Sequence, residues 1–144
     1  MSPVHQFRFG VSEEHIDRNG HVNNVVYVQW MQDAAIHHSE ASGCARASRN
    51  ANAIWVVRSH YVKYLKPAFS GDEIVALTWV CDFRRAVSLR KYRFLRSGDN
   101  AVLSTGTTEW VFVDAASGHP RVIPDSVRNT FILAPPDFEP KPSI

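Results

Sequence analysis

Cysteine is scarce in this sequence, and long hydrophobic runs are absent. Only two of the 144 residues are cysteines, Cys44 and Cys81, and neither belongs to a C-x-x-C pair or to a histidine-rich cluster with metal-site spacing. We therefore expect two reduced, structural thiols and no bound metal. No apolar run approaches the ~20 residues of a membrane-spanning helix, and the N-terminus has no apolar stretch typical of a secretory signal. These absences favour a cytoplasmic location.

Signature motifs of several large enzyme classes are missing as well. The sequence contains no Gly-x-Ser-x-Gly nucleophile elbow, no phosphate-binding loop and no dinucleotide fingerprint, which excludes serine hydrolases of that type, kinases and Rossmann enzymes. A chain of 16.3 kDa with 44% hydrophobic and 21% charged residues is instead typical of one globular domain. We expect this domain to span residues 1–144, with a Pro-rich, extended and mobile tail over 135–144.

Hydrophobic periodicity predicts one long helix over residues 25–42. Five residues fall on one stripe of such a helix: Tyr27, Trp30, Met31, Ala34 and His38. Gly43 stands where a C-capping glycine belongs, and Asn23 or Asn24 supplies the N-cap. A stripe of this kind forms plain core in most helices, and lining of a substrate slot is the alternative.

The remaining segments predict a mainly antiparallel sheet. β-branched and aromatic residues fill strand-length segments at 5–11, 54–65, 73–83, 87–96 and 101–114, and short connections favour antiparallel neighbours. A polar loop is expected over 45–52, and a short helix over 124–131 with Pro124 at its first position. One helix ~10 Å across cannot cover a sheet about 20 Å wide. The sheet must therefore curl around the helix or meet a second copy of the chain.

The segment before the helix concentrates polar groups suited to catalysis. Asp17, Asn19, Gly20 and His21 lie directly before the first helical turn. That turn leaves backbone N–H groups unpaired, so it can hold a carbonyl oxygen that becomes negative during acyl transfer. Gly20 permits close approach of a substrate, and Asp17 is a candidate general base or nucleophile. Turn and capping roles for the same residues are the structural alternative.

A longer pattern strengthens the catalytic interpretation. Asp-x-Asn-Gly-His-Val-Asn-Asn-x-x-Tyr-x-x-Trp, which runs from Asp17 to Trp30, resembles the signature of hotdog-fold thioesterases, close to the 4-hydroxybenzoyl-CoA thioesterase-like group and to plant acyl-ACP thioesterases. Residues 64–68 and 71–73 resemble a second block of that family. The resemblance covers residues 5–125. It implies an α+β hotdog fold, a curled antiparallel five-stranded sheet around one long central helix, assembled as a homodimer or homotetramer.

The resemblance also implies roles for individual residues. Asp17 matches the catalytic carboxylate, and Asn24 matches the helix-start residue whose backbone N–H polarises the thioester carbonyl. Asn19 and His21 match polar residues around the site of the plant enzymes. His21 either shuttles a proton or caps the loop. At the position where the plant enzymes carry a Glu-Cys pair, this chain has Ser59 and His60. The absence of a carboxylate and a thiol there disfavours a mechanism that uses a catalytic cysteine.

Candidate substrate-binding residues fall into two groups. The first lies in the motif and on the helix: Gly20, Val22, Tyr27 and Trp30. The second is basic: Arg58 on a strand, with Arg84, Arg85 and Arg90. The last three belong to a cluster of six basic residues within 84–96, which also contains Lys91, Arg93 and Arg96. CoA phosphates or the acidic surface of acyl carrier protein suit this cluster. The alternative is a solvated strand face with ion pairs. Few aromatic residues lie between the basic ones, which argues against binding of nucleic acid.

The sequence as a whole predicts a thioesterase that hydrolyses acyl-CoA or acyl-ACP thioesters to free acid and thiol. No cofactor is expected, because CoA or phosphopantetheine is part of the substrate, and neither nucleic acid nor membrane is an expected partner. Two other functions remain open on the same fold. One is a hydroxyacyl-thioester dehydratase, and the other is a non-catalytic acyl-CoA-binding protein.

Overall fold

Five strands and one long helix dominate the structure, a computed structural model that describes residues 2–140. Along the chain the elements are β1 (His5–Gly10), the 3-10 helix η1 (Glu13–His15), α1 (Asn24–Ser42), α2 (Cys44–Asn50), β2 (Ala53–Tyr64), β3 (Glu73–Arg84), β4 (Val87–Arg96), β5 (Val102–Asp114) and α3 (Asp125–Arg128). The strands form one sheet in the order β1-β3-β4-β5-β2, and every neighbouring pair is antiparallel. Within residues 2–140 no helix is both long and apolar enough to cross a membrane.

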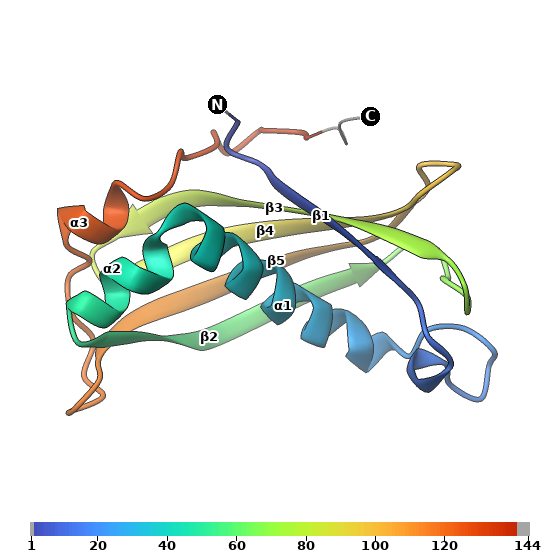
Figure 1. Ribbon diagram of the computed structural model, residues 1–144, viewed down its shortest axis with the longest axis horizontal. Coiled ribbons are helices and arrows are strands. Elements are labelled where there is room, and N and C mark those ends of the chain that lie inside the picture. The colour runs from blue at the N-terminus through green and yellow to red at the C-terminus, as the bar shows by residue number, and fades with distance from the viewer. Residues whose placement is uncertain (1, 141–144) are drawn as a thin grey trace.

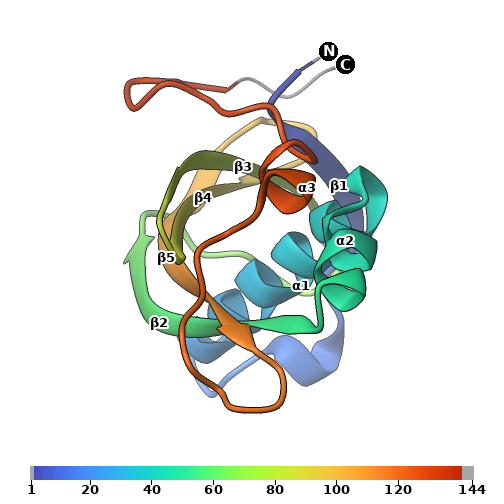
Figure 2. The same cartoon turned by 90° about the vertical axis from the view of Figure 1, so that its left-hand side faces the viewer.

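The sheet curls around α1. Figure 1 shows α1 lying across the concave side of the sheet, and Figure 2 shows the strands as a curved wall with the helix inside it. Curling brings both edges of the sheet toward the helix, so that one helix can cover a wide concave face. The predicted hotdog architecture is therefore confirmed.

The predicted helical stripe forms the centre of the core. Four of its residues are buried against the concave face: Tyr27, Trp30, Met31 and Ala34. Asn23 caps the helix by accepting a hydrogen bond from the Val25 N–H at 3.1 Å, and Gly43 ends it with a φ of 92°. At Gly106 of β5, an added Cβ would lie 2.8 Å from the Met31 sulfur. Helix and sheet are thus in close contact at this point.

Two local predictions were wrong, one about the type of structure and one about the bounds of a helix. Residues 45–52 were expected to form a polar loop, but α2 extends to Asn50. Alanine and arginine favour this helix, and Cys44 and Ser48, one turn apart, both bury their side chains. The last helix is confined to Asp125–Arg128, with Pro124 as its N-cap residue rather than its first helical residue. Both cysteines are free, as predicted.

The segment that follows α3 lies on the convex face of the sheet. The Phe138 ring packs against Trp79 with ring centroids 5.9 Å apart, and the Ala134 N–H donates to the Val80 carbonyl at 3.0 Å. Arg93 of β4 donates to the carboxylate of Glu139. Residues 135–140 of the Pro-rich tail therefore contact the sheet, and the rest of that tail, 141–144, lies outside the described residues.

Three histidines join β1 to α1. The His5 ring stacks on the His38 ring at 4.8 Å, and His5 Nε2 and His37 Nδ1 share a hydrogen bond of 2.6 Å. Arg90 Nη1 donates a hydrogen bond to His38 Nδ1 at 2.9 Å, so that nitrogen carries no proton. Burial, followed by the nearby Arg90, His5 and His37, lowers the pKa of His38 to about 3. His38 is therefore neutral at physiological pH.

We expect neutral His38 to make the free energy of unfolding depend on pH. Its pKa in the folded chain, about 3, lies below the ordinary value of 6.5, so the unfolded chain binds the extra proton between these pH values. The stability is fully present above pH 6.5 and is lost as the pH falls toward 3, by at most about 1.4 kcal/mol per pH unit. Urea unfolding at several pH values should show a shallower decline for His38→Asn, whose amide oxygen can still accept from Arg90. Equal slopes for the two proteins would contradict this expectation.

Candidate active site

The segment before α1 folds into a compact turn. The Asp17 N–H donates to the His21 carbonyl at 2.9 Å, and the Gly20 N–H donates to the Asp17 carbonyl at 3.1 Å. An antiparallel bridge between Ile16 and Val22 flanks the turn. Gly20 has a φ of 83°, a left-handed conformation that glycine adopts without the steric cost of a Cβ. The motif that starts at Asp17 thus begins as a hairpin-like loop with a glycine at its tip.

Two backbone hydrogen bonds anchor this loop to the rest of the protein. The Val22 N–H donates to the Ala68 carbonyl, and the Asn23 N–H donates to the His15 carbonyl, each at 2.9 Å. The Val22 side chain is buried in the core beside α1. Val22 therefore holds the loop against the domain, and its contribution to a binding site is through the position of its neighbours.

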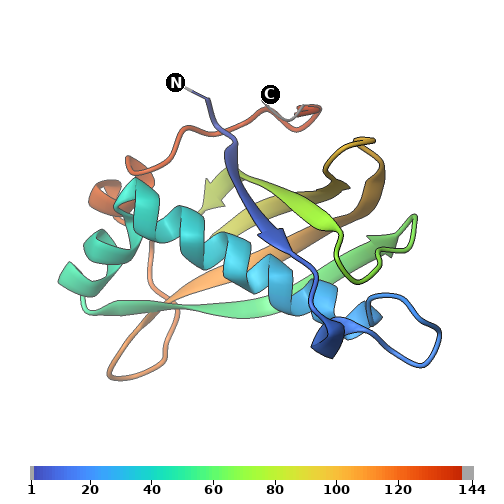
Figure 3. The ribbon, with the colours of Figure 1, turned by 45° about the vertical axis from the view of Figure 1, so that its right-hand side comes forward.

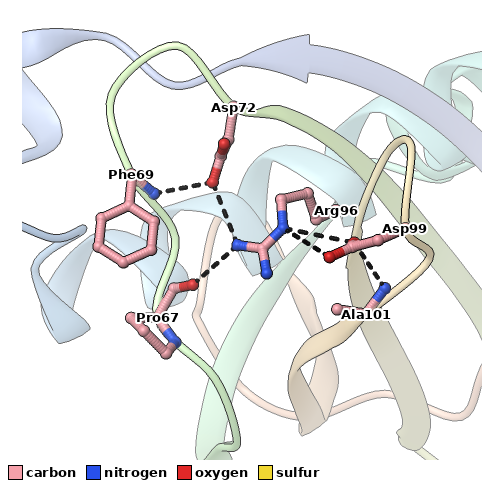
Figure 4. A network of polar contacts seen from close by, with 6 residues as sticks. All are labelled: Pro67, Phe69, Asp72, Arg96, Asp99 and Ala101. Atoms are coloured by element: carbon pink, nitrogen blue, oxygen red, sulfur yellow. Dashed lines mark hydrogen bonds and ion pairs between the residues drawn. The ribbon is translucent and has the colours of Figure 1, made fainter.

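A guanidinium network holds the connection that supports the loop (Figure 4). Arg96 Nη1 donates to the Pro67 carbonyl at 3.1 Å and to the Asp72 carboxylate at 3.3 Å, while Arg96 Nε donates to Asp99 at 3.3 Å. Asp72 also accepts from the Phe69 N–H at 2.9 Å. These contacts tie the turn between β4 and β5 to residues 67–72. Arg96 is therefore a structural member of the basic cluster.

Asp17 and the first turn of α1 lie at the two ends of the loop. Asp17 Oδ1 accepts a hydrogen bond from the Asn19 N–H at 2.8 Å, and Oδ2 accepts from no group within residues 2–140. Asn23 Oδ1 occupies the Val25 N–H. The Asn24 N–H has no hydrogen-bond partner in the described part of the chain. The loop therefore offers a carboxylate oxygen and a helix-start N–H that are both available to a ligand.

A tyrosine that sequence reasoning did not assign fixes the start of α1. Tyr64, at the end of β2, donates its hydroxyl to the Asn24 carbonyl at 2.9 Å and packs against Tyr27 with ring centroids 5.6 Å apart. Its place at the start of residues 64–68, the second block that resembles the family, was the available signal. Tyr27 and Trp30 are buried and point into the core, which favours the core role for both. Burial also raises the pKa of Tyr27 to about 12.

The strand β4 distributes its basic residues over both faces of the sheet. Lys91 and Arg93 point to the convex face, where they contact the tail segment. Arg90 points to the concave face and is only 5% exposed. The basic residues of β4 therefore do not form a single exposed surface, because neighbouring residues of a strand point to opposite faces.

Two other arginines, Arg84 and Arg85, lie where β3 ends, away from the loop, and Arg58 lies midway along β2. Arg58 and Arg84 approach the Glu109 carboxylate at 3.1 and 3.7 Å, and Arg85 is exposed in the turn between β3 and β4. Strand β3 starts beside the loop region and runs for 12 residues to Arg84, which is roughly 35 Å along the strand. Within one chain, the sheet therefore keeps Arg84 and Arg85 away from Asp17.

Comparison with known proteins places this arrangement in a family. The fold is similar to YbaW, a probable thioesterase from Escherichia coli, with 18% identity and a TM-score of 0.80 over 87% of this chain and 94% of that chain. It is also similar to DHNA-CoA thioesterase from Staphylococcus aureus (21% identity, TM-score 0.75, 83% and 80% covered) and to PA2801, a putative thioesterase from Pseudomonas aeruginosa (24%, 0.77, 87% and 95%). Identities this low establish the shared fold. The sequence itself matches the thioesterase-like superfamily over residues 11–131, a range that includes the loop, α1 and strands β2 to β5, so this chain belongs to that superfamily.

Proposed function

We propose that this chain hydrolyses acyl thioesters of coenzyme A or acyl carrier protein to a free acid and a thiol. The observation that carries the proposal is the placement of the Asp17 carboxylate on a loop that leads directly to the unpartnered Asn24 N–H. Membership of the thioesterase-like superfamily supports a thioester as the substrate. The reaction needs no separate cofactor, because the CoA or phosphopantetheine arm belongs to the substrate.

In the proposed reaction, the Asn24 N–H donates a hydrogen bond to the thioester carbonyl oxygen. This oxygen becomes negative when the tetrahedral intermediate forms, and the partial positive charge of the helix start stabilises it. Asp17 either takes a proton from the attacking water or attacks the carbonyl carbon itself. The side chains of Asn19 and His21 orient the water or the substrate, and Gly20 keeps the loop in its tight shape. If water attacks, the C–S bond breaks as the intermediate collapses, and the proton held by Asp17 passes to the departing thiolate, which leaves the free acid. If Asp17 attacks, loss of the thiolate leaves an anhydride between the acyl group and Asp17, and a water molecule then hydrolyses this anhydride to the free acid and the aspartate.

Three arginines of the sheet are our candidates for binding the phosphates of CoA or an acidic carrier protein. Arg58, Arg84 and Arg85 contribute three positive charges, while Asp82 and Glu109 supply two carboxylates as ion-pair partners of Arg58 and Arg84. Positive charge therefore remains at this surface. Guanidinium groups bind phosphate oxygens through paired hydrogen bonds, which suits them to this task.

We also propose a homodimer, or a homotetramer of two such dimers, built through β2. This 12-residue strand lies at the edge of the sheet, and within the described residues it pairs with β5 alone. Exposed apolar side chains flank it, including Ile54 and Tyr61 on β2 and Ile36 on α1. A long exposed edge readily pairs with another strand. Antiparallel pairing of two β2 strands would bring the arginine-rich end of one copy beside the catalytic loop of the other.

Lysines on β2 should disrupt this dimer. If the whole strand pairs with its copy, residue 56 of one chain lies opposite residue 61 of the other, so the double variant Val56→Lys/Tyr61→Lys places like charges across the interface. Light scattering after size exclusion should give a mass of 16.3 kDa for the variant and at least twice that value for the wild type. The control Val122→Lys, on an exposed loop, should keep the wild-type mass. A monomeric wild type would contradict the proposal.

The two unpaired cysteines agree with a cytoplasmic location for this enzyme. Cys44 and Cys81 are both free, and reduced thiols are the norm in that compartment. Acyl-CoA and acyl carrier protein substrates are consistent with the same setting. We therefore include the cytoplasm in the proposal.

A thiol-release assay tests the proposed reaction. Purified protein is incubated with acyl-CoAs of short, medium, long and aromatic type, and then with acyl-ACPs. We expect stoichiometric release of thiol and free acid from at least one class. Dehydration of a hydroxyacyl thioester without thiol release, or binding of acyl-CoA without any turnover, would replace hydrolysis with one of the other two functions of this fold.

A further inference from the structure

A cavity of about 320 Å³ lies between the second half of α1, α2 and the concave face of the sheet. Its wall is mainly apolar and includes Trp55, Phe83, Trp110 and Phe131. At ~30 Å³ for a water-sized group, it has room for about ten non-hydrogen atoms. Figure 3 shows α2 and α3 at the end of α1 that lies away from the Asp17 loop. Within one chain, the proposed hydrolysis therefore leaves this cavity without a role.

One charged side chain, Arg90, lines the cavity from the concave face of β4. Its Nη1 donates to Thr78 Oγ1 at 3.0 Å and to His38 Nδ1 at 2.9 Å, and its guanidinium carbon lies 5.3 Å from the centre of the Phe131 ring. Both hydrogen bonds leave from the same nitrogen. Nε and Nη2 donate to no group within residues 2–140. The side chain therefore keeps two donor nitrogens for a ligand.

The charge of Arg90 is not balanced by its surroundings. A guanidinium remains protonated even when buried, and an uncompensated buried charge is costly. The two groups that accept from Arg90, Thr78 and His38, are neutral. Glu40 contributes to the cavity lining, but it pairs with Arg49 at 3.5 Å, and both side chains are largely exposed at the rim. No carboxylate of the described chain forms an ion pair with Arg90.

We propose that this cavity is a binding site for an amphipathic carboxylate of about ten non-hydrogen atoms, such as a medium-chain or aromatic acid. The carboxylate accepts hydrogen bonds from Nε and Nη2 of Arg90, and the apolar body lies against Trp55 and Trp110. A bound carboxylate supplies the counter-charge that the protein lacks here, and the apolar wall excludes water from the pair. The inference does not depend on thioester hydrolysis, because it concerns binding alone.

Octanoate, with ten non-hydrogen atoms, is a suitable probe, and 1-octanol is its neutral counterpart. Calorimetric titration should show octanoate binding, accompanied by a change in tryptophan fluorescence, and weaker binding of 1-octanol. Arg90→Met should lower octanoate affinity by about 10- to 100-fold, since a hydrogen-bonded charge pair is lost. The control Arg93→Met removes an arginine of the same strand that faces the convex side, and it should bind octanoate like the wild type.

The comparison of octanoate with 1-octanol on the wild-type protein tests the proposal even if Arg90→Met fails to fold. Equal affinities for octanoate and 1-octanol, or no binding of either, would overturn the proposal, as would unchanged octanoate affinity in a folded Arg90→Met protein. Where thiol release is measurable, octanoate that competes with the acyl-CoA assigns the cavity to the acyl group of the substrate. If octanoate binds but does not compete with the acyl-CoA, the cavity is assigned to a free acid. Both results support a carboxylate site at Arg90.

Discussion

Asp17→Asn should fold like the wild type and lose about 10²- to 10⁴-fold in thiol release, the usual effect of removing an essential base. The amide oxygen of asparagine can still accept the hydrogen bond from the Asn19 N–H, so the turn that Asp17 forms is retained. The amide can neither accept a proton from water nor attack a carbonyl carbon. Steady-state kinetics with the best acyl-CoA measures the loss of thiol release, and circular dichroism shows whether the variant is folded.

A second aspartate provides the matched control for this experiment. Asp137 lies exposed in the segment on the convex face, and Asp137→Asn makes the same chemical change far from the loop. It should leave thiol release unchanged. If the folded Asp17→Asn protein kept most of its activity, Asp17 would be a turn residue only, and the catalytic carboxylate would have to lie elsewhere.

Phe94→Ala should lower the free energy of unfolding by about 3–5 kcal/mol, which is a large part of the 5–15 kcal/mol typical of a domain. Phe94 is fully buried on β4, and its ring lies 6.0 Å from that of Tyr27 and 6.1 Å from that of Trp30. Truncation removes apolar contacts and leaves a cavity under the first half of α1. Urea unfolding followed by circular dichroism measures the loss.

Two further variants separate cavity formation from a general effect of removing an aromatic ring. Phe94→Leu keeps most of the apolar volume, so its loss of stability should be clearly smaller than that of Phe94→Ala. Phe69→Ala removes a partly exposed ring outside the core and away from β2, and it should lower stability by clearly less than Phe94→Ala, by about 1 kcal/mol at most. Similar losses for Phe94→Ala and Phe69→Ala would show that the core under α1 is less tightly packed than the structure indicates.

The candidate site could be located from the sequence because its residues are adjacent in the chain. Asp17, Gly20 and Asn24 lie within one turn and one helix start, and local hydrogen bonds set their geometry. The residues that support them come from distant segments. Ala68 receives the Val22 N–H, and Tyr64 binds the helix start, so only the folded chain shows these contacts. The roles of the candidate catalytic residues stay predictions until activity is measured.

The amino-acid sequence was enough to predict the five strands, the long helix and the short last helix in their order along the chain, with most of their bounds. Local chemistry explains this success: the stripe from Tyr27 to Ala34 requires a helix, Gly43 requires its end, and the turn signals separate the strands. It misjudged residues 45–52, where α2 gains stability by burying Cys44 and Ser48 against other parts of the protein. Propensity over seven residues is too weak to reveal such a helix without its packing partners.

The contacts of the arginines became visible only in the folded chain. In the sequence, the basic residues of 84–96 form one cluster, yet the pleat of β4 sends Arg93 to the convex face and Arg90 to the cavity inside the curled sheet. Whether a charge meets solvent, a carboxylate or an apolar wall depends on which strands and helices cover it. That covering comes from the curl of the sheet around α1, which brings together residues far apart in the chain.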